Sequence, residues 1–273
     1  MPSTPAQDEI VPALIEQWDV LDGLLREIPE ADWRAASILP GWRVQDIVSH
    51  IVGTELMLLG EQPPAPVSDP REHEHVHNDI AAINEQWVEH LHDETPERMR
   101  DRFRAVMSQR ATTLRELSSE QWDQASFGPT GPTTFGGFMR IRLFDCWMHE
   151  LDLRDSTGLA GDEGGPRGVI SLDVIAAGLP YAVGRKARAP RGSTITFTTT
   201  GPVERAIHIE VGEKARLVPA HDGPPTVAIT LPFGLLARLA AGRVRAVDHR
   251  GEITVEGDAG LATAILDNLA FVM

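Results

Sequence analysis

The sequence FMRIRLFDCWMHELDL, residues 138–153, carries a polar stripe through an otherwise apolar helical segment. The stripe consists of Arg142, Asp145, His149 and Asp152. At about 100° per residue, these four side chains fall within roughly 80° of arc, so a carboxylate and an imidazole one turn apart face the same space. An Asp and a His at this spacing can hold a metal ion, provided that a second element supplies a third ligand.

His50 is the candidate for the third ligand. It lies in the middle of LPGWRVQDIVSHIVGTELMLLG, residues 39–60, where a Pro-Gly pair precedes an apolar helical run. A core histidine satisfied by a neighbour is the commoner explanation for a single helical His. Burying His50, Asp145 and His149 without a metal would require partners for each, because unpaired buried ions are costly. The residue pattern alone leaves both interpretations open, a metal site and a metal-free buried cluster.

The periodicity up to Arg154 is helical and predicts four long helices with a fifth element. The predicted segments are 8–28, 44–60, 77–92, 96–117 and 138–153. The stretch DSTGLAGDEGGPRG, residues 155–168, is rich in Gly and Asp and predicts a domain boundary. We therefore expect two domains, residues 1–157 and 166–273.

The second domain has the pattern of an α+β module. A helix is predicted at 169–185, and β-branched, alternating segments predict strands. The expected strands are 193–200, 205–211, 226–232 and 251–258, and further helices are expected at 231–242 and 259–272. A mostly antiparallel sheet is the favoured arrangement.

Two motifs, LPGWRVQDIVSH (39–50) and RLFDCWMHELDLRDSTG (142–158), resemble the mycothiol-dependent maleylpyruvate isomerase family. The resemblance spans nearly the whole chain, including HNDIAAINEQWV (77–88) and the C-terminal αβ module. It implies a two-domain α plus α/β fold, in which a DinB-like four-helix bundle precedes a sterol-carrier-like domain.

The same resemblance implies metal ligands at His50, Asp145 and His149. The family has a metal-binding His at the first position, and a carboxylate and a His four residues apart at the other two. This sequence has Asp at position 145, where a Glu is often found. Because Asp is shorter by one methylene, the metal should lie closer to this helix or be held by one oxygen.

These ligands predict a catalytic rather than a structural site. Two neutral imidazoles and one carboxylate leave Zn²⁺, or another divalent ion, with a net charge near +1 and an open position. A thiol bound there loses its proton near neutral pH. The resemblance implies that this thiol is mycothiol, the cysteine conjugate of actinobacteria. We expect a transferase or isomerase that acts on a small electrophilic substrate. The alternatives are a metal-dependent hydrolase and a noncatalytic metal or small-molecule binding protein of the DinB-like superfamily.

Four further residues are candidates for the site. Arg142 could balance carboxylate charge or hold an anionic substrate, although a surface ion pair explains it equally well. The resemblance implies that a C-terminal arginine approaches the pocket, and we favour Arg243. Asn78 and Trp87 could contact a cofactor at the pocket mouth, although a helix cap and a packed indole explain them as well. Asp152 lies one turn beyond His149 and could orient its ring.

The segment REHEHVHND, residues 71–79, places three His at alternate positions and could gather a metal if extended. A solvated loop tip is favoured, because a proline-rich stretch precedes it. Cys146 is predicted to be a buried structural thiol.

Composition limits the partners. The chain has 273 residues and a formal net charge of −15, and we expect no clustered Lys and Arg, so nucleic acid and anionic membranes are not expected partners. A single cysteine rules out an intrachain disulfide and fits a reducing compartment. With no signal sequence and no apolar run near 20 residues, we expect a cytoplasmic protein. A monomer or homodimer that binds a small thiol and an electrophile is expected.

Overall fold

The structure is a computed structural model, which describes residues 5–66, 68–128 and 131–272. The chain divides into two compact units, which we call the N-terminal unit (Met1–Gly161) and the C-terminal unit (Asp162–Met273). The division falls inside the Gly- and Asp-rich stretch that suggests a boundary in the sequence.

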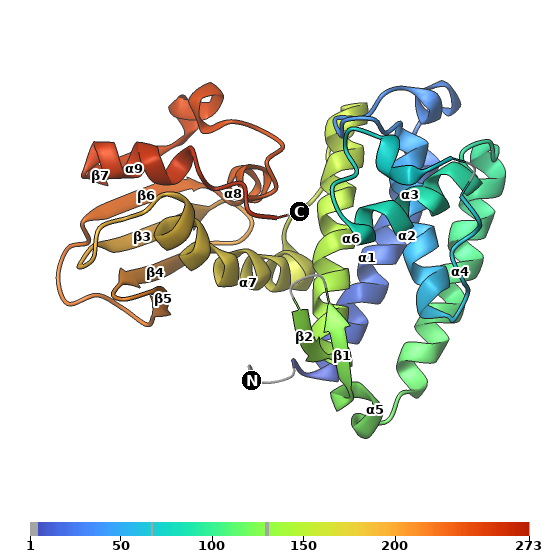
Figure 1. Cartoon of the computed structure of the whole chain (residues 1–273), viewed down its shortest axis with the longest axis horizontal. Coiled ribbons are helices and arrows are strands. Elements are labelled where there is room, and N and C mark those ends of the chain that lie inside the picture. Colours follow the sequence, from blue (N-terminus) through green and yellow to red (C-terminus); the bar gives the residue numbers. More distant parts are fainter. Residues whose placement is uncertain (1–4, 67, 129–130, 273) are drawn as a thin grey trace. The chain divides into compact units, whose positions relative to one another are not determined.

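In the described part of the N-terminal unit, four long helices form a bundle, as the sequence predicts (Figure 1). They are α1 (Gln7–Glu27), α2 (Val44–Leu58), α4 (Pro96–Glu116) and α6 (Phe135–Thr157). The helix α3, Asp79–Leu91, packs on α2. The shorter elements are η1 (Glu30–Arg34), η2 (Pro70–Glu72), α5 (Ser119–Asp123), β1 (Ala125–Gly128) and β2 (Gly131–Thr134).

The helix α6 runs through the centre of this unit and contacts α1, α2 and β1. It begins where the Thr134 side chain accepts a hydrogen bond from the backbone of Gly137, and it ends at Gly158 in the left-handed conformation. Most of its apolar residues are buried, and so are Arg142, His149 and Asp152 of the polar stripe. Because the stripe is inside the bundle, every charge on it needs a partner.

Close packing of α2 and α3 depends on one glycine. A Cβ atom at Gly53 would collide with the indole of Trp87, which is 4% exposed. The missing side chain therefore lets α3 lie against α2, and Trp87 is a packing residue between the two helices.

The C-terminal unit contains α7 (Gly165–Tyr181), which continues into the π-helical turn Ala182–Lys186, and a sheet of five strands among the described residues. The strand order is β5-β4-β3-β6-β7, and only the β3–β6 pair is parallel within this sheet. The predicted mostly antiparallel sheet is confirmed. The bounds are Thr194–Thr200 (β3), Arg205–Val211 (β4), Ala215–Val218 (β5), Val227–Pro232 (β6), Thr254–Gly257 (β7), Phe233–Ala240 (α8), Ala246–Glu252 (η4) and Ala259–Leu266 (α9).

The core of the C-terminal unit follows from strand alternation. Ile195 and Phe197 of β3 are fully buried, as are Val227 and Ile229 of β6. Phe197 is paired in register with Ile229, so these apolar side chains form one layer. The helices α7, α8 and α9 all contact the sheet and complete an α+β unit.

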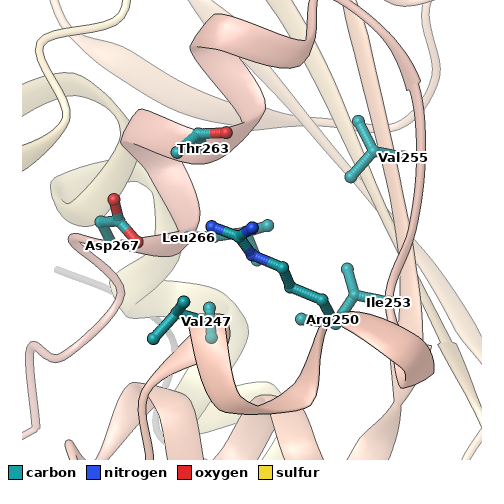
Figure 2. Close-up of a pocket in the computed structure, with 8 residues that line it drawn as sticks. Val247, Arg250, Ile253, Val255, Thr263, Leu266 and Asp267 are labelled. Atoms are coloured by element: carbon teal, nitrogen blue, oxygen red, sulfur yellow. The ribbon is translucent and has the colours of Figure 1, made fainter.

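A cleft of about 310 Å³ lies between η4, β7 and α9 (Figure 2). Val247, Ile253 and Leu266 line it, and Arg250 extends into it. It contains none of the site residues predicted from the sequence.

The charge is divided unequally between the units. The C-terminal unit has 12 Asp and Glu and 12 Lys and Arg, so the net charge of −15 falls on the N-terminal unit.

Arg185, Arg191 and Lys214 line a cleft of about 710 Å³. The expectation that Lys and Arg are not clustered is therefore wrong here, because the sequence RKARAPR (185–191) meets the β4–β5 turn in space. The absence of an anionic macromolecular partner stays a prediction.

The segment Gly165–Lys186 has the length and the mean hydropathy, 1.2, of a membrane span. Half of the most apolar 18-residue stretch of this segment is buried inside the structure, as in the core helix of a folded domain. The expectation that no segment approaches a span is therefore too strong for this helix.

A fragment of residues 1–161 tests whether the N-terminal unit has its own core. We expect the fragment to give a helical far-ultraviolet circular dichroism spectrum and a cooperative thermal transition, because all four bundle helices lie within it. A fragment without helical signal or without a cooperative transition would show that the two units share one core.

Candidate metal centre

Three predicted ligands converge between α2 and α6. The Nε2 atom of His50 is 3.4 Å from Oδ2 of Asp145, and the Nε2 atom of His149 is 3.8 Å from Oδ1 of the same carboxylate. One potential ligand atom from each side chain lies within 4.8 Å of the others. The structure thus brings together the His, Asp and His that the sequence singled out, with the two imidazoles facing one carboxylate.

His149 is held in this orientation by its neighbour on the helix. Its Nδ1 atom is 2.9 Å from Oδ2 of Asp152, a carboxylate with no exposed surface. This hydrogen bond is the contact that the spacing predicts, and it leaves Nε2 directed at Asp145. His50 differs, because its Nδ1 atom is buried without a hydrogen-bond partner in the described part of the chain.

A series of charged side chains of alternating sign extends from the cluster into the bundle. Glu55 of α2 is fully buried and accepts hydrogen bonds from Arg110 of α4, at 2.7 Å, and from Arg142 of α6, at 3.0 Å. Arg142 also forms an ion pair with Oδ2 of Asp145. The four groups alternate in sign and join three bundle helices to the carboxylate of the cluster.

Electrostatics set the protonation of the two facing groups. Desolvation alone would raise the pKa of Asp145, but the nearby charge of Arg142, helped by His149 and His50, lowers this pKa well below its usual range. Burial lowers the pKa of His50, despite the opposing effect of Asp145. The cluster therefore offers an ionised carboxylate and a neutral imidazole at neutral pH, which are the forms that bind metals.

Cys146 takes no part in the cluster. It is fully buried, and burial raises the pKa of its thiol to about 12. A neutral, enclosed thiol is neither a metal ligand nor a nucleophile, so the predicted structural role is the one that fits.

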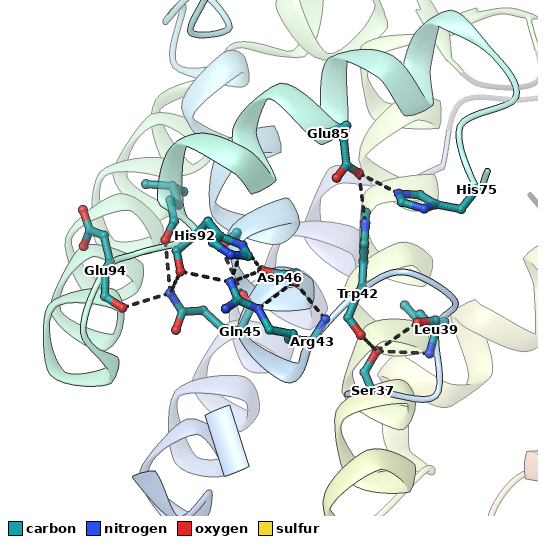
Figure 3. Close-up of polar contacts among 12 residues, drawn as sticks. Ser37, Leu39, Trp42, Arg43, Gln45, Asp46, His75, Glu85, His92 and Glu94 are labelled. Carbon is teal, nitrogen blue, oxygen red and sulfur yellow. Dashed lines mark hydrogen bonds and ion pairs between the residues drawn. The ribbon is translucent and has the colours of Figure 1, made fainter. Parts of the chain in front are cut away.

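Trp42 covers the two histidines. Its ring centroid is 5.5 Å from that of His50 and 6.4 Å from that of His149. Figure 3 shows how the indole is held: its Nε1 donates to Glu85 of α3 at 3.0 Å, and the same carboxylate contacts His75 at 2.9 Å. Sequence reasoning missed this contact, because Trp42 and Glu85 are joined only by the packing of α3 on α2.

A second network fixes the start of α2 (Figure 3). The side chain of Asp46 accepts a hydrogen bond from the backbone of Arg43, and the Arg43 side chain binds Asp46 and His92. The Gln45 amide donates to the backbone carbonyls of His92 and Glu94. These bonds tie the first turn of α2 to the end of α3, so His50 is held on a helix with a fixed start.

Other predicted residues lie elsewhere. Asn78 is the exposed N-cap of α3, where its side chain accepts from the backbone of Ala81, and Trp87 packs on Gly53. Neither lines the cleft beside the cluster. Arg243 lies in the C-terminal unit after α8 and donates to the carbonyl of Ala241. No observation tests the cofactor roles of Asn78 and Trp87 or the catalytic role of Arg243, which stay predictions.

The three histidines of the 71–79 segment do not gather around an ion. His73 contacts Glu89 at 3.2 Å, and His75 contacts Glu85. Among the described residues, the His50 cluster is the only group with metal-binding geometry. Six of the nine residues of this segment are exposed, as in the expected solvated loop, and the two His–Glu contacts attach it to α3.

Models of a known protein family match both units of the chain. Residues 14–154 match the model of the mycothiol maleylpyruvate isomerase N-terminal domain, and residues 170–264 match the model of the C-terminal domain of the same proteins. The chain belongs to this family. The sequence-based resemblance is thereby confirmed. No curated protein sequence matches the chain significantly.

Solved structures show the same fold. A mycothiol-dependent maleylpyruvate isomerase has a TM-score of 0.59 and 18% identity, over 93% of this chain and 95% of that chain. A histidine-to-alanine mutant of such an isomerase has a TM-score of 0.61 and 17% identity, over the same shares. At these identities the likeness establishes the two-domain fold that the family implies.

The donor set of this family member fits a divalent ion such as Zn²⁺. Two imidazole nitrogens and a carboxylate oxygen face one space, and the second nitrogen of His149 is anchored by Asp152. Arg142 and His50 engage Oδ2 of Asp145, which leaves Oδ1 on the side of His149. This arrangement favours the one-oxygen contact that the shorter Asp suggests.

Metal content tests the ligand assignment. We expect the purified protein to hold about one divalent ion per chain, and His50→Ala and His149→Ala to lose it, because each removes one of three ligands. We expect Asp145→Asn to weaken metal affinity more than Asp152→Asn, since losses beyond the direct ligands typically cost about 10- to 100-fold. Elemental analysis and competitive chelator titration measure these changes.

The control for metal content is His77→Ala, which removes an exposed imidazole outside the cluster. Full metal retention in both histidine variants would eliminate the site. If Asp145→Asn lost its metal to the chelator no more readily than the wild type, while Asp152→Asn bound metal more weakly, then Asp152 rather than Asp145 would be the metal ligand.

Stability measurements test the charge chain. We expect Glu55→Gln to lower the free energy of unfolding by about 3–5 kcal/mol, because it leaves Arg110 and Arg142 buried without their shared carboxylate. Asp22→Asn is the matched control: Asp22 also pairs with two arginines, but near the surface, so a change of about 1 kcal/mol or less is expected. Urea denaturation measures both, and equal losses would contradict a structural role for Glu55.

Proposed function

We propose that the protein is a metal-dependent, thiol-using enzyme that performs S-transfer or cis–trans isomerisation on a small electrophile. His50, Asp145 and His149 would hold the ion, Zn²⁺ being the favoured one. The observation that carries this proposal is the convergence of three ligand side chains, within 4.8 Å, beside an open cleft. Family membership supports mycothiol as the thiol.

The number of ligands favours catalysis over a structural role. Within the described residues, three side chains form the group, whereas structural zinc sites are closed by four. When bound, the ion lowers the pKa of a coordinated thiol, so the thiolate is available near neutral pH.

The protein's own residues prepare this chemistry. The alternating charges of Arg110, Glu55, Arg142 and Asp145 sum to zero, so the positive charge of a bound ion is left to attract an anionic sulfur. Asp152 holds the ring of His149, and Trp42 packs against both imidazoles. The three ligands thus stay fixed while one side faces the cleft.

The proposed reaction balances without an oxidant or reductant. The thiol gives its proton to solvent, and its sulfur forms a bond to the electrophilic carbon. In isomerisation, a double bond opens to a single bond, rotates and reforms as the same thiol leaves. In transfer to an epoxide, the C–S bond replaces a C–O bond and the oxygen takes a proton.

Thiol-dependent turnover tests the function. With maleylpyruvate and a simple epoxide as the two probe electrophiles, we expect the metal-loaded protein to convert at least one of them, and only when mycothiol is present. His149→Ala should lose at least about 10²-fold in rate, because the ion is lost with its ligand. Mass spectrometry of the products separates isomerisation from transfer. Cys146→Ala is the control and should retain the rate, since the buried thiol takes no part in the proposed reaction.

Two outcomes would overturn the proposal. Equal turnover without any thiol would identify a metal hydrolase that uses water. Metal binding without turnover of any electrophile, across mycothiol, glutathione and bacillithiol, would identify a noncatalytic binding protein.

A further inference from the structure

The lining of the cleft beside the cluster is mostly apolar. The cleft has a volume of about 310 Å³ and opens between α2, α3, α6 and β1. His50, Arg142 and Asp145 form its polar end. The apolar lining consists of Met57, Ile80, Ile83, Phe127, Phe138 and Ile141.

Exposed apolar side chains are concentrated at this cleft. In the described part of the N-terminal unit, four large hydrophobic residues are exposed, and three of them line it. They are Ile80 (46%), Ile83 (36%) and Phe127 (72%), and the fourth is Ile38 (39%). Scattered exposed hydrophobics are normal, but a concave group next to reactive side chains indicates a binding site.

The charges at the polar end do not suit an anionic substrate. Arg142 is the only cation in the described lining, and its guanidinium is engaged by Glu55 and Asp145. The hydroxyl of Thr54 donates to the carbonyl of His50. A substrate carboxylate along the apolar wall of this cleft would lose water, and no cationic side chain in the described lining is left to pair with it, which is costly.

We propose that the cleft binds an uncharged, apolar arm of the electrophile, with the reacting carbon at the end near His50 and Asp145. The inference rests on the proposed function and names its substrate class: an epoxide or enone with an alkyl or aryl substituent, rather than a small dicarboxylate. The size fits, since an apolar cavity of about 150 Å³ already holds benzene. The amide of Asn84, also in the lining, is placed for one polar group of such a ligand.

Binding of an uncharged dye tests the cleft without any turnover. N-phenyl-1-naphthylamine should fluoresce when bound to the metal-loaded full chain, and 1-alkanols should displace it about fourfold more tightly per added methylene, the fold-change equivalent to ~0.8 kcal/mol. Alkyl carboxylates of the same length should displace it more weakly.

Matched variants locate the binding. Ile83→Glu should weaken dye and alkanol binding by roughly tenfold, because it places a charge on the apolar wall. Ile80→Asn is a second variant at a more exposed position, and Ile38→Asn is the control, which should bind normally. Circular dichroism confirms that each variant is folded.

The outcomes separate this inference from the proposed function. Three results would overturn the apolar cleft, even if turnover with mycothiol is normal. They are a failure of alkanols to displace the dye, displacement that does not depend on alkanol chain length, and equal dye binding in Ile83→Glu and the Ile38→Asn control. A change in sedimentation mass of Ile83→Glu with unchanged dye binding would also overturn it, because the patch would then be a contact between proteins. Normal displacement with no thiol-dependent turnover would overturn the proposed function alone. If both hold, kcat/KM for 1,2-epoxyalkanes should rise with chain length, and Ile83→Glu should abolish the rise.

Discussion

The buried carboxylate of Glu55, shared by Arg110 and Arg142, is the constraint on which the N-terminal unit depends. The three charged residues lie on three different helices, and a buried ion left without its partner is strongly destabilising. The bundle therefore has one arrangement of α2, α4 and α6 in which these charges are satisfied. Because Arg142 extends the chain to Asp145, the same constraint that fixes the bundle also aims the carboxylate at His50 and His149.

The site combines this rigid base with two further supports. Asp152 turns the ring of His149, while Trp42, held by Glu85, packs over both imidazoles. Each support comes from a different helix or loop, so the ligands are oriented by the fold before any ion arrives. Such preorganisation reduces the conformational cost of binding a metal and keeps one side of the cluster open. The open side meets an apolar cleft, and the substrate class follows from that neighbour rather than from the ligands.

The sequence predicts the helices, the strands and the ligand cluster because each of them follows from the local periodicity of polar and apolar residues. The stripe from Arg142 to Asp152 lies on one helix, and His50 stands in a second apolar segment. Pairing across elements has no such local record. Glu55 in an apolar run and Arg110 on the apolar side of α4 are signals that each needs a partner, but the sequence does not say which one. The β1–β2 hairpin was missed because its strands are only four residues long and lack apolar alternation. The cluster of Arg185, Arg191 and Lys214 was not expected from the sequence, because the overall charge of −15 conceals a C-terminal unit whose net charge is zero.

The most direct test of the central claim is the electronic spectrum of the protein loaded with Co²⁺ in place of its own metal. We expect a spectrum typical of a low-coordinate site with nitrogen and oxygen ligands, and a new thiolate-to-cobalt charge-transfer band when mycothiol is added. His50→Ala should show neither. A cobalt spectrum that does not change with thiol, or one that survives the loss of His50, would contradict an open metal site built from His50, Asp145 and His149.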